Sequence, residues 1–195
     1  MDFQFEQWIN RGAGSHHIVD AIMVILAQWS EPCFIALVLG WFVFGALGGR
    51  PGERQAARAA LLASGLALVV NQLISHVWSR PRPFVGHPGS VHVLLAHSAD
   101  SSFPSDHVAA AVAIGLVIWA VHRRLGLASL VLAAAVGYAR VFVGDHYPGD
   151  VVGGAVVGLV SGAIMASGSV ANGLSSADAA VGARVADRIG TWRSR

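Results

Sequence analysis

Histidine, arginine and aspartate gather in three short stretches of this 195-residue chain, and these residue types suit chemistry on a phosphate group. The stretches read RPRPF from residue 80, SSFPSDH from residue 101 and RVFVGDHYPGD from residue 140. Phosphoryl transfer needs donors for the non-bridging oxygens, a nucleophile, and an acid for the leaving group. Arginine is a suitable donor, because its planar guanidinium binds phosphate through two hydrogen bonds and stays charged. We therefore predict Arg82 and Arg140 as phosphate clamps, with Arg80 as a helper.

His146 and Asp150 lie four residues apart, a spacing that suits a catalytic pair at the start of a helix. Proline is favoured in the first turn, so a helix that begins near Pro148 would let the carboxylate reach back to the imidazole. A carboxylate on one ring nitrogen fixes the tautomer and leaves the other nitrogen free to attack phosphorus. This pattern predicts His146 as the nucleophile and His107 as the acid that protonates the departing oxygen.

Pro104, Ser105 and Asp106 precede an apolar run and predict a second helix start. Free backbone N–H groups at such a start favour a bound anion, and the Ser105 hydroxyl can add one hydrogen bond. The same residues also fit an ordinary helix cap. The neighbouring histidine and the arginines favour phosphate binding, although histidines in membrane helices also serve in interhelical hydrogen bonds or as haem ligands.

The elements that must position these residues are predicted to be membrane helices. Hydrophobic residues make up 54% of the chain and charged residues only 12%, and the mean hydropathy is +0.59. A spanning helix needs about 20 mostly apolar residues. We therefore predict an all-α, polytopic bundle of about six transmembrane helices, which forms one domain over residues 1–195 with a mobile tail from about 171 to 195. Charge-free intervals give the spans: about 16–29 (the weakest), 32–49, 59–79, 107–122, 125–139 and 151–177.

The arginines predict the orientation of this bundle. Every one of the 13 basic residues is Arg, and six spans would put ten of them on the side of the N-terminus. Arg80, Arg82 and Arg140 fall on the opposite side, together with the catalytic candidates. Because basic residues concentrate on the cytoplasmic side, we expect the site at the outer face of the membrane.

Other features bound the class of protein. A single cysteine, Cys33, excludes an internal disulfide and, without a Cys/His cluster, makes a structural zinc site improbable. No basic segment precedes an apolar one at the N-terminus, so we expect no cleavable signal peptide. The long segment from Arg80 to Pro104 holds four of the seven prolines and is predicted to be a functional loop.

The motifs resemble those of the type 2 phosphatidic acid phosphatase superfamily. Its signatures are K-x6-R-P, P-S-G-H and S-R-x5-H-x3-D, and they correspond here to Arg82-Pro83, Pro104 to His107, and Ala139 to Asp150, within residues 75–150. Three positions depart from the signatures. Ser75 stands in place of the lysine, so Arg80 is a hypothetical substitute for its charge; Asp106 replaces the glycine and Ala139 replaces the first serine.

The full strings are similar to the bacterial undecaprenyl-diphosphatase branch, which is linked to bacitracin resistance. That resemblance implies hydrolysis of undecaprenyl pyrophosphate to the monophosphate at the outer face of the plasma membrane, which recycles the lipid carrier of cell-wall (peptidoglycan) synthesis. It implies His146 as the nucleophile that forms a phosphohistidine, His107 as the acid, and no metal or other cofactor. The implied partners are a polyprenyl pyrophosphate lipid and the bilayer, with no nucleic acid; the oligomeric state stays open.

Several alternatives remain at this level. The same chemistry suits phosphatidylglycerophosphate, phosphatidate or another lipid phosphate. A haem-carrying bundle would use His107 and His146 without needing the arginines, and a pyrophosphate-lipid carrier would need the arginines without the His146–Asp150 pair. Among the other polar residues, Asn71, Gln72 and His76 could line the site or bond between helices, and we favour bonding between helices. We expect His87, His92 and His97 to be solvated. Asp145 could tune the pKa of His146 or face water, and we assign no role to it.

Overall fold

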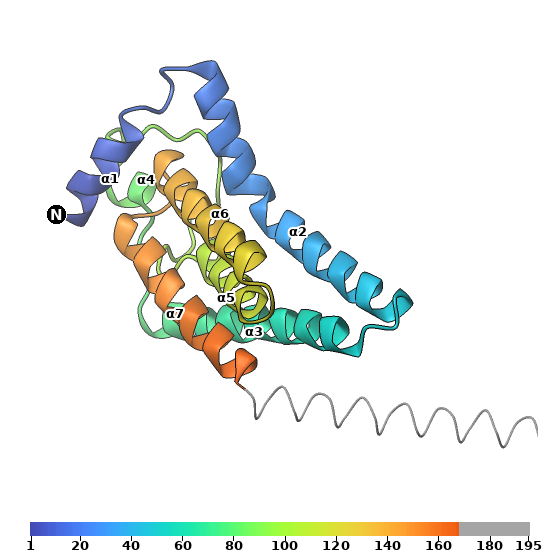
Figure 1. Cartoon of the computed structure of the whole chain (residues 1–195). Coiled ribbons are helices and arrows are strands. Elements are labelled where there is room, and N and C mark those ends of the chain that lie inside the picture. Colours follow the sequence, from blue (N-terminus) through green and yellow to red (C-terminus); the bar gives the residue numbers. More distant parts are fainter. Residues whose placement is uncertain (168–195) are drawn as a thin grey trace, which may run out of the picture.

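The structure is a computed structural model and describes residues 1–167, so the tail predicted from about residue 171 lies outside the described residues. The described part contains only helices (Figure 1). All-α architecture is therefore confirmed. In chain order the helices are α1 (Asp2–Asn10), α2 (His17–Leu47), α3 (Pro51–Val77), α4 (Pro83–Gly86), α5 (Asp106–Val121), α6 (Arg123–Phe142) and α7 (Pro148–Ala166).

Helix α2 differs from the sequence prediction. The two expected spans at 16–29 and 32–49 form one continuous helix that includes Pro32, so the count of about six spans is not confirmed. A proline inside a helix removes one backbone hydrogen bond and can kink the helix without ending it. Figure 1 shows α2 changing direction partway along its length.

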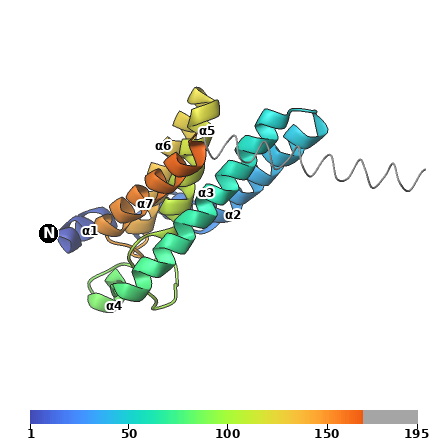
Figure 2. The same cartoon turned by 90° about the horizontal axis from the view of Figure 1, so that it is seen from below.

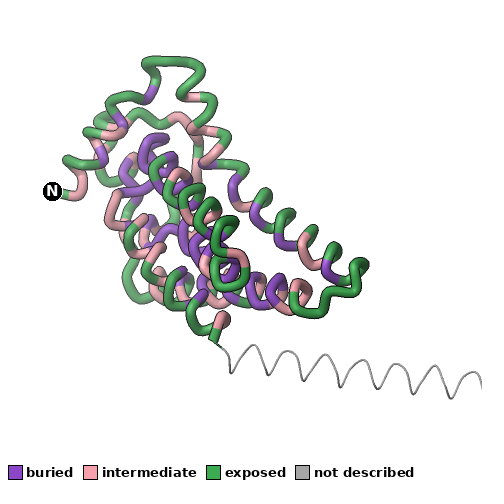
Figure 3. Tube along the Cα trace, in the orientation of Figure 1, coloured by how far each residue is buried: buried purple, intermediate pink, exposed green. Residues whose placement is uncertain are grey.

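Four helices, α2, α3, α6 and α7, are long and apolar enough to cross a membrane, and α5 is a shorter apolar helix. Their outward faces carry large exposed apolar side chains, which give the bundle the green rim in Figure 3. Soluble domains rarely expose contiguous apolar surface of this extent. The chain is therefore a multi-pass membrane protein.

Helix α5 forms the centre of the bundle and packs against α3, α6 and α7 (Figures 1 and 2). Glycines on α7 allow a close approach to α5. A Cβ atom at Gly154 would lie 2.5 Å from the Ser105 carbonyl oxygen, and one at Gly158 would lie 2.5 Å from that of Ala109. The small residues therefore let the two helices that carry the predicted histidine motifs touch along their backbones.

The N-terminal helix α1 was not among the predicted elements. It is too short to cross a membrane and packs against α6 and α7 (Figures 1 and 2). Asn10 fixes its end, because the side-chain amide donates to the carbonyl oxygens of His92 and Phe142 and accepts from the His92 amide. Helix α1 thus ties the long loop after α3 to the end of α6.

Because α2 is one continuous helix, Arg11 lies at a different end of the bundle from the one that the sequence predicted. Arg11 lies at the same end as Arg80, Arg82 and Arg140, and not with the arginines at the far end as the six-span prediction required. The far end carries Arg50, Arg54, Arg58, Arg123 and Arg124 among the described residues.

Candidate active site

His146 lies in the turn between α6 and α7 and is almost fully buried, at 2% exposure. Its Nδ1 atom is 2.8 Å from the backbone carbonyl oxygen of Ser102. A carbonyl only accepts, so this contact places the ring proton on Nδ1 and leaves a lone pair on Nε2. Burial lowers the pKa of His146 and favours this neutral ring. Nε2 therefore carries the lone pair of the neutral ring and lies on the side of the ring away from Ser102.

Asp150 supports the imidazole less directly than the spacing predicted. Its Oδ2 atom is 3.7 Å from Nδ1, and the Ser102 hydroxyl lies between them, 2.5 Å from Oδ2 and 3.4 Å from Nδ1. Helix α7 does begin at Pro148, and Asp150 accepts a hydrogen bond from the Tyr147 amide at 2.9 Å. Ser102 therefore links the two side chains: its carbonyl oxygen contacts His146 and its hydroxyl donates to Asp150. The sequence analysis did not single out Ser102.

Arg82 and Arg140 converge on the free nitrogen of His146. Nη1 of Arg82 is 3.4 Å and Nη2 of Arg140 is 3.2 Å from Nε2. Both side chains are buried, and Nη1 of Arg140 also donates to the Ala27 carbonyl oxygen of α2. Two guanidiniums beside one nucleophilic nitrogen form an arrangement that can bind the oxygens of a phosphate as its phosphorus approaches Nε2.

Asp145 bridges these two guanidiniums. The buried carboxylate pairs with Nη1 of Arg82 at 2.6 Å through Oδ1 and with Nη2 of Arg140 through Oδ2. A second carboxylate, Asp100, accepts from Nε of Arg82 at 2.8 Å. Asp145, to which the sequence analysis assigned no role, therefore orients both clamps and partly neutralises them.

A cavity of about 330 Å³ opens in front of His146 and is lined by Arg82, Arg140 and His107. Nε2 of His107 lies 3.5 Å from Oε2 of Glu31, which reaches the cavity from α2. Glu31 had not been singled out, because the sequence shows only a charge at a span boundary. The remaining walls come from α3 and from the loop before α5: Leu68, Gln72, Ser75, His97, Asp100, Ser101, Pro104 and Asp106.

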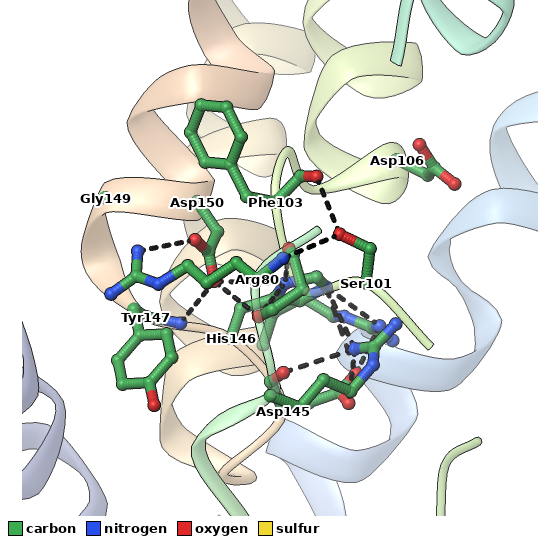
Figure 4. A network of polar contacts seen from close by, with 12 residues as sticks. Arg80, Ser101, Phe103, Asp106, Asp145, His146, Tyr147, Gly149 and Asp150 are labelled. Carbon is green, nitrogen blue, oxygen red and sulfur yellow. Dashed lines mark hydrogen bonds and ion pairs between the residues drawn. The ribbon is translucent and has the colours of Figure 1, made fainter. Parts of the chain in front are cut away.

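Two predicted phosphate ligands do not line this cavity. Arg80 points to Asp2 and Asp150 instead, so it does not replace the missing lysine charge beside Ser75 (Figure 4). Ser105 is fully buried at the start of α5, and its hydroxyl has no hydrogen-bond partner. Its amide donates to the Asp150 carbonyl oxygen at 3.1 Å, which links α5 to α7 behind the site.

The departures from the family signatures have local partners. Asp106 accepts a hydrogen bond from the Asn71 amide at 2.8 Å, which joins α3 to α5 as expected for Asn71. The Ser75 hydroxyl donates to the Phe103 carbonyl oxygen at 3.0 Å. Gln72 and His97 line the cavity, which differs from the predicted interhelical and solvated roles. Within residues 1–167, no group of three or more His, Cys, Asp or Glu side chains is placed to hold a metal ion.

Comparison with known proteins identifies the family. The model of the PAP2 superfamily matches residues 56–173. Undecaprenyl-diphosphatase BcrC of Bacillus subtilis strain 168 is 37% identical over 153 residues, which cover 76% of this chain and 75% of that protein. Putative undecaprenyl-diphosphatase YbjG of Escherichia coli K12 is 34% identical over 115 residues, or 58% of this chain and 57% of its own length.

Among solved structures, LpxE of Aquifex aeolicus aligns with a TM-score of 0.70 at 24% identity and covers 83% of this chain and 92% of its own. The first transmembrane PAP2-type phosphatidylglycerolphosphate phosphatase from Bacillus subtilis aligns with a TM-score of 0.63 at 20% identity, covering 83% of each chain. These likenesses concern the fold. The bundle, the site and the match over residues 56–173 together assign the chain to the PAP2 superfamily.

Proposed function

We propose that the chain is a membrane phosphatase that hydrolyses undecaprenyl pyrophosphate to undecaprenyl phosphate and inorganic phosphate. The observation that carries the proposal is the position of Nε2 of His146, 3.4 Å from one buried guanidinium and 3.2 Å from another. A haem ligand or a passive carrier site does not require a neutral histidine beside two arginines. The named activity of the BcrC relative, 37% identical over most of the chain, supports the pyrophosphate lipid as substrate.

In this mechanism Nε2 of His146 attacks the terminal phosphorus, and the bond from that phosphorus to the bridging oxygen breaks. Arg82 and Arg140 bind the non-bridging oxygens, where charge develops. The lipid monophosphate departs with its electron pair, and His107 supplies a proton where the leaving oxygen needs one. Water then attacks the phosphohistidine with His107 as base, which releases inorganic phosphate and restores His146.

The arginine distribution supports a site at the extracytoplasmic face of the bacterial plasma membrane. Among residues 1–167, five arginines lie at the end opposite the site, whereas three of the four at the site end are held by site carboxylates. Arg11 is the remaining one. Basic residues favour the cytoplasmic side, so the cavity would face outwards. At that face the enzyme would return the lipid carrier to peptidoglycan synthesis, a role that also accounts for bacitracin resistance.

The test is phosphate release by purified protein in detergent with EDTA present. We expect release from undecaprenyl pyrophosphate to exceed release from phosphatidate and phosphatidylglycerophosphate. The reverse order would assign the site to a lipid monophosphate, and an inert wild type on all three would contradict the phosphatase function.

The variant His107→Ala tests whether His107 protonates the leaving group. A lipid phosphate is a far better leaving group than the alkoxide of a monoester, so it depends less on an acid. We expect His107→Ala to lower kcat by about a hundredfold or more on phosphatidate and by a smaller factor on the pyrophosphate. The exposed His76→Ala is the matched control and keeps the wild-type ratio. Equal losses on both substrates would contradict an acid role for His107.

A further inference from the structure

Arg80 joins two carboxylates that lie far apart in the sequence. Its Nη1 donates to Oδ1 of Asp150 at 2.8 Å, and its Nη2 donates to Oδ2 of Asp2 at 2.8 Å. The guanidinium carbon also lies 3.8 Å from the centroid of the Tyr147 ring. Figure 4 shows the side chain extended along the start of α7 towards Asp150. These contacts occupy both terminal nitrogens of Arg80.

Asp2 has a second contact at the same place. Its Oδ1 atom accepts a hydrogen bond from the Gly149 amide at 2.9 Å. Gly149 is the second residue of α7, where backbone amides lack partners within the helix. Asp2 therefore caps α7 from another helix, one residue before Asp150. Stacking of Phe3 on His87, with ring centroids 3.5 Å apart, holds this end of α1 against the loop.

Asp150 depends on these neighbours because it is fully buried, at 0% exposure. A buried carboxylate is costly unless it is paired and hydrogen-bonded. Arg80 is the guanidinium paired with it, while Ser102 and the Tyr147 amide donate to its other oxygen. Loss of Arg80 would leave the charge uncompensated and loosen the Asp150–Ser102 contact that lies against His146.

We propose that Asp2 and Arg80 are positioning residues, which act through Asp150 and Ser102 to hold His146, so that α1 is a working part of the active site. The proposal rests on the proposed function only in taking His146 as the nucleophile. In this proposal Arg80 helps to position His146 and does not bind the phosphate. Neither residue belongs to the three family signatures, so only the contacts of the folded chain point to them.

Steady-state kinetics on undecaprenyl pyrophosphate separate these two roles for Arg80. A positioning residue changes kcat, whereas a residue that binds ground-state phosphate changes KM. We expect Arg80→Gln to lower kcat by about tenfold to a hundredfold with KM within about twofold, as for other groups that orient a reactive side chain. Asp2→Asn, which removes a partly exposed ion pair, should lower kcat by roughly threefold. The double variant should be no slower than Arg80→Gln, because both residues act through one contact.

Asp20→Asn is the matched control, since Asp20 also accepts a backbone amide near α1 but has no contact with the site. It should keep the wild-type kcat. A raised KM with unchanged kcat in Arg80→Gln, or a wild-type kcat in Asp2→Asn, would overturn the proposal and leave the phosphatase function intact.

Hydrogen–deuterium exchange at the Gly149 amide gives a readout that needs no substrate. Asp2→Asn should speed this exchange, because the acceptor loses its charge, while Asp20→Asn should not. An inert wild type would count against the proposed function alone, and unchanged exchange at Gly149 would then still overturn the role of Asp2.

Discussion

His122 with Glu53 at the far end of the bundle and His146 with Asp150 at the site end are both histidine–carboxylate pairs, but they differ in distance, burial and surroundings. At the far end, Nε2 of His122 lies 3.0 Å from Oε2 of Glu53, and Trp41 donates to the same oxygen at 2.6 Å. The His122 side chain is 38% exposed. At the site end, His146 and Asp150 are 3.7 Å apart and almost fully buried.

The shorter contact is therefore at the end that has no other feature of a phosphate site. What distinguishes His146 is a carbonyl acceptor on one nitrogen, two guanidiniums at the other, and a cavity in front of it. A histidine beside a carboxylate is thus a weak criterion for catalysis by itself. The criteria that separate the two ends are a histidine with a fixed tautomer, its burial, and arginines beside its second nitrogen.

The largest effect should come from exchanging the two histidines for glutamine, one at a time. We expect His146→Gln to lower phosphate release from undecaprenyl pyrophosphate by at least about a thousandfold, because it removes the nucleophile. His122→Gln should keep at least about half of the activity, since the His122 side chain is partly exposed and lies at the end of the bundle opposite His146. Equal losses of activity in both variants would contradict the distinction between the two ends of the bundle.

A smaller effect is expected from Ser102→Ala, which keeps the backbone carbonyl beside Nδ1 and removes the hydroxyl beside Asp150. We expect kcat to fall by about tenfold, with KM nearly unchanged, since the hydroxyl orients Asp150 without touching the phosphate. Ser64→Ala is the control, because it removes a hydroxyl that donates to the Leu61 carbonyl oxygen within α3, away from the site. An unchanged kcat in Ser102→Ala would mean that the carbonyl alone orients His146.

The last effect concerns stability, not activity, and contrasts a carboxyl group at each end. Glu6 of α1 is fully buried without a hydrogen-bond partner, and burial raises its pKa from 4.5 to about 7. The folded state therefore binds more protons than the unfolded state between these values, so stability falls as the pH rises from about 4.5 to about 7. Each unit of that shift corresponds to about 1.4 kcal/mol, which sets an upper bound of about 3 kcal/mol on the loss.

Thermal unfolding in detergent at about pH 5 and about pH 8 measures this loss. Glu6→Gln should raise the midpoint at the higher pH and flatten its pH dependence, because the amide carries no charge to bury. Glu53→Gln should not raise it, since Glu53 is paired with His122 and Trp41. A Glu6→Gln variant that stays as pH-sensitive as the wild type would show that another group controls stability in this range.

Much of the fold was predictable because membrane helices are encoded locally by runs of apolar residues. Helix α6 shows this best: the charge-free run was short for a span, and Arg140 lies in its last turn, where a buried site accepts it. Helix α2 was divided wrongly, because Glu31 and Pro32 suggest a break in sequence while the surrounding turns keep the helix continuous. Helix α1 was missed because a single nine-residue helix has too little apolar periodicity to be recognised.

The sequence by itself determined the kind of chemistry: His146, His107, Arg82 and Arg140 stand at spacings that bring them to one end of the bundle, and the structure gathers all four around one cavity. Only the tertiary structure decided how they are supported. Contacts across long sequence separations, such as Asp2 with Arg80 and Ser102 with Asp150, produce no periodic pattern in the sequence from which they could be predicted. They depend on which helix ends meet in space, which explains why Arg80 pairs with Asp150 and Asp2 although its sequence context predicted a phosphate ligand.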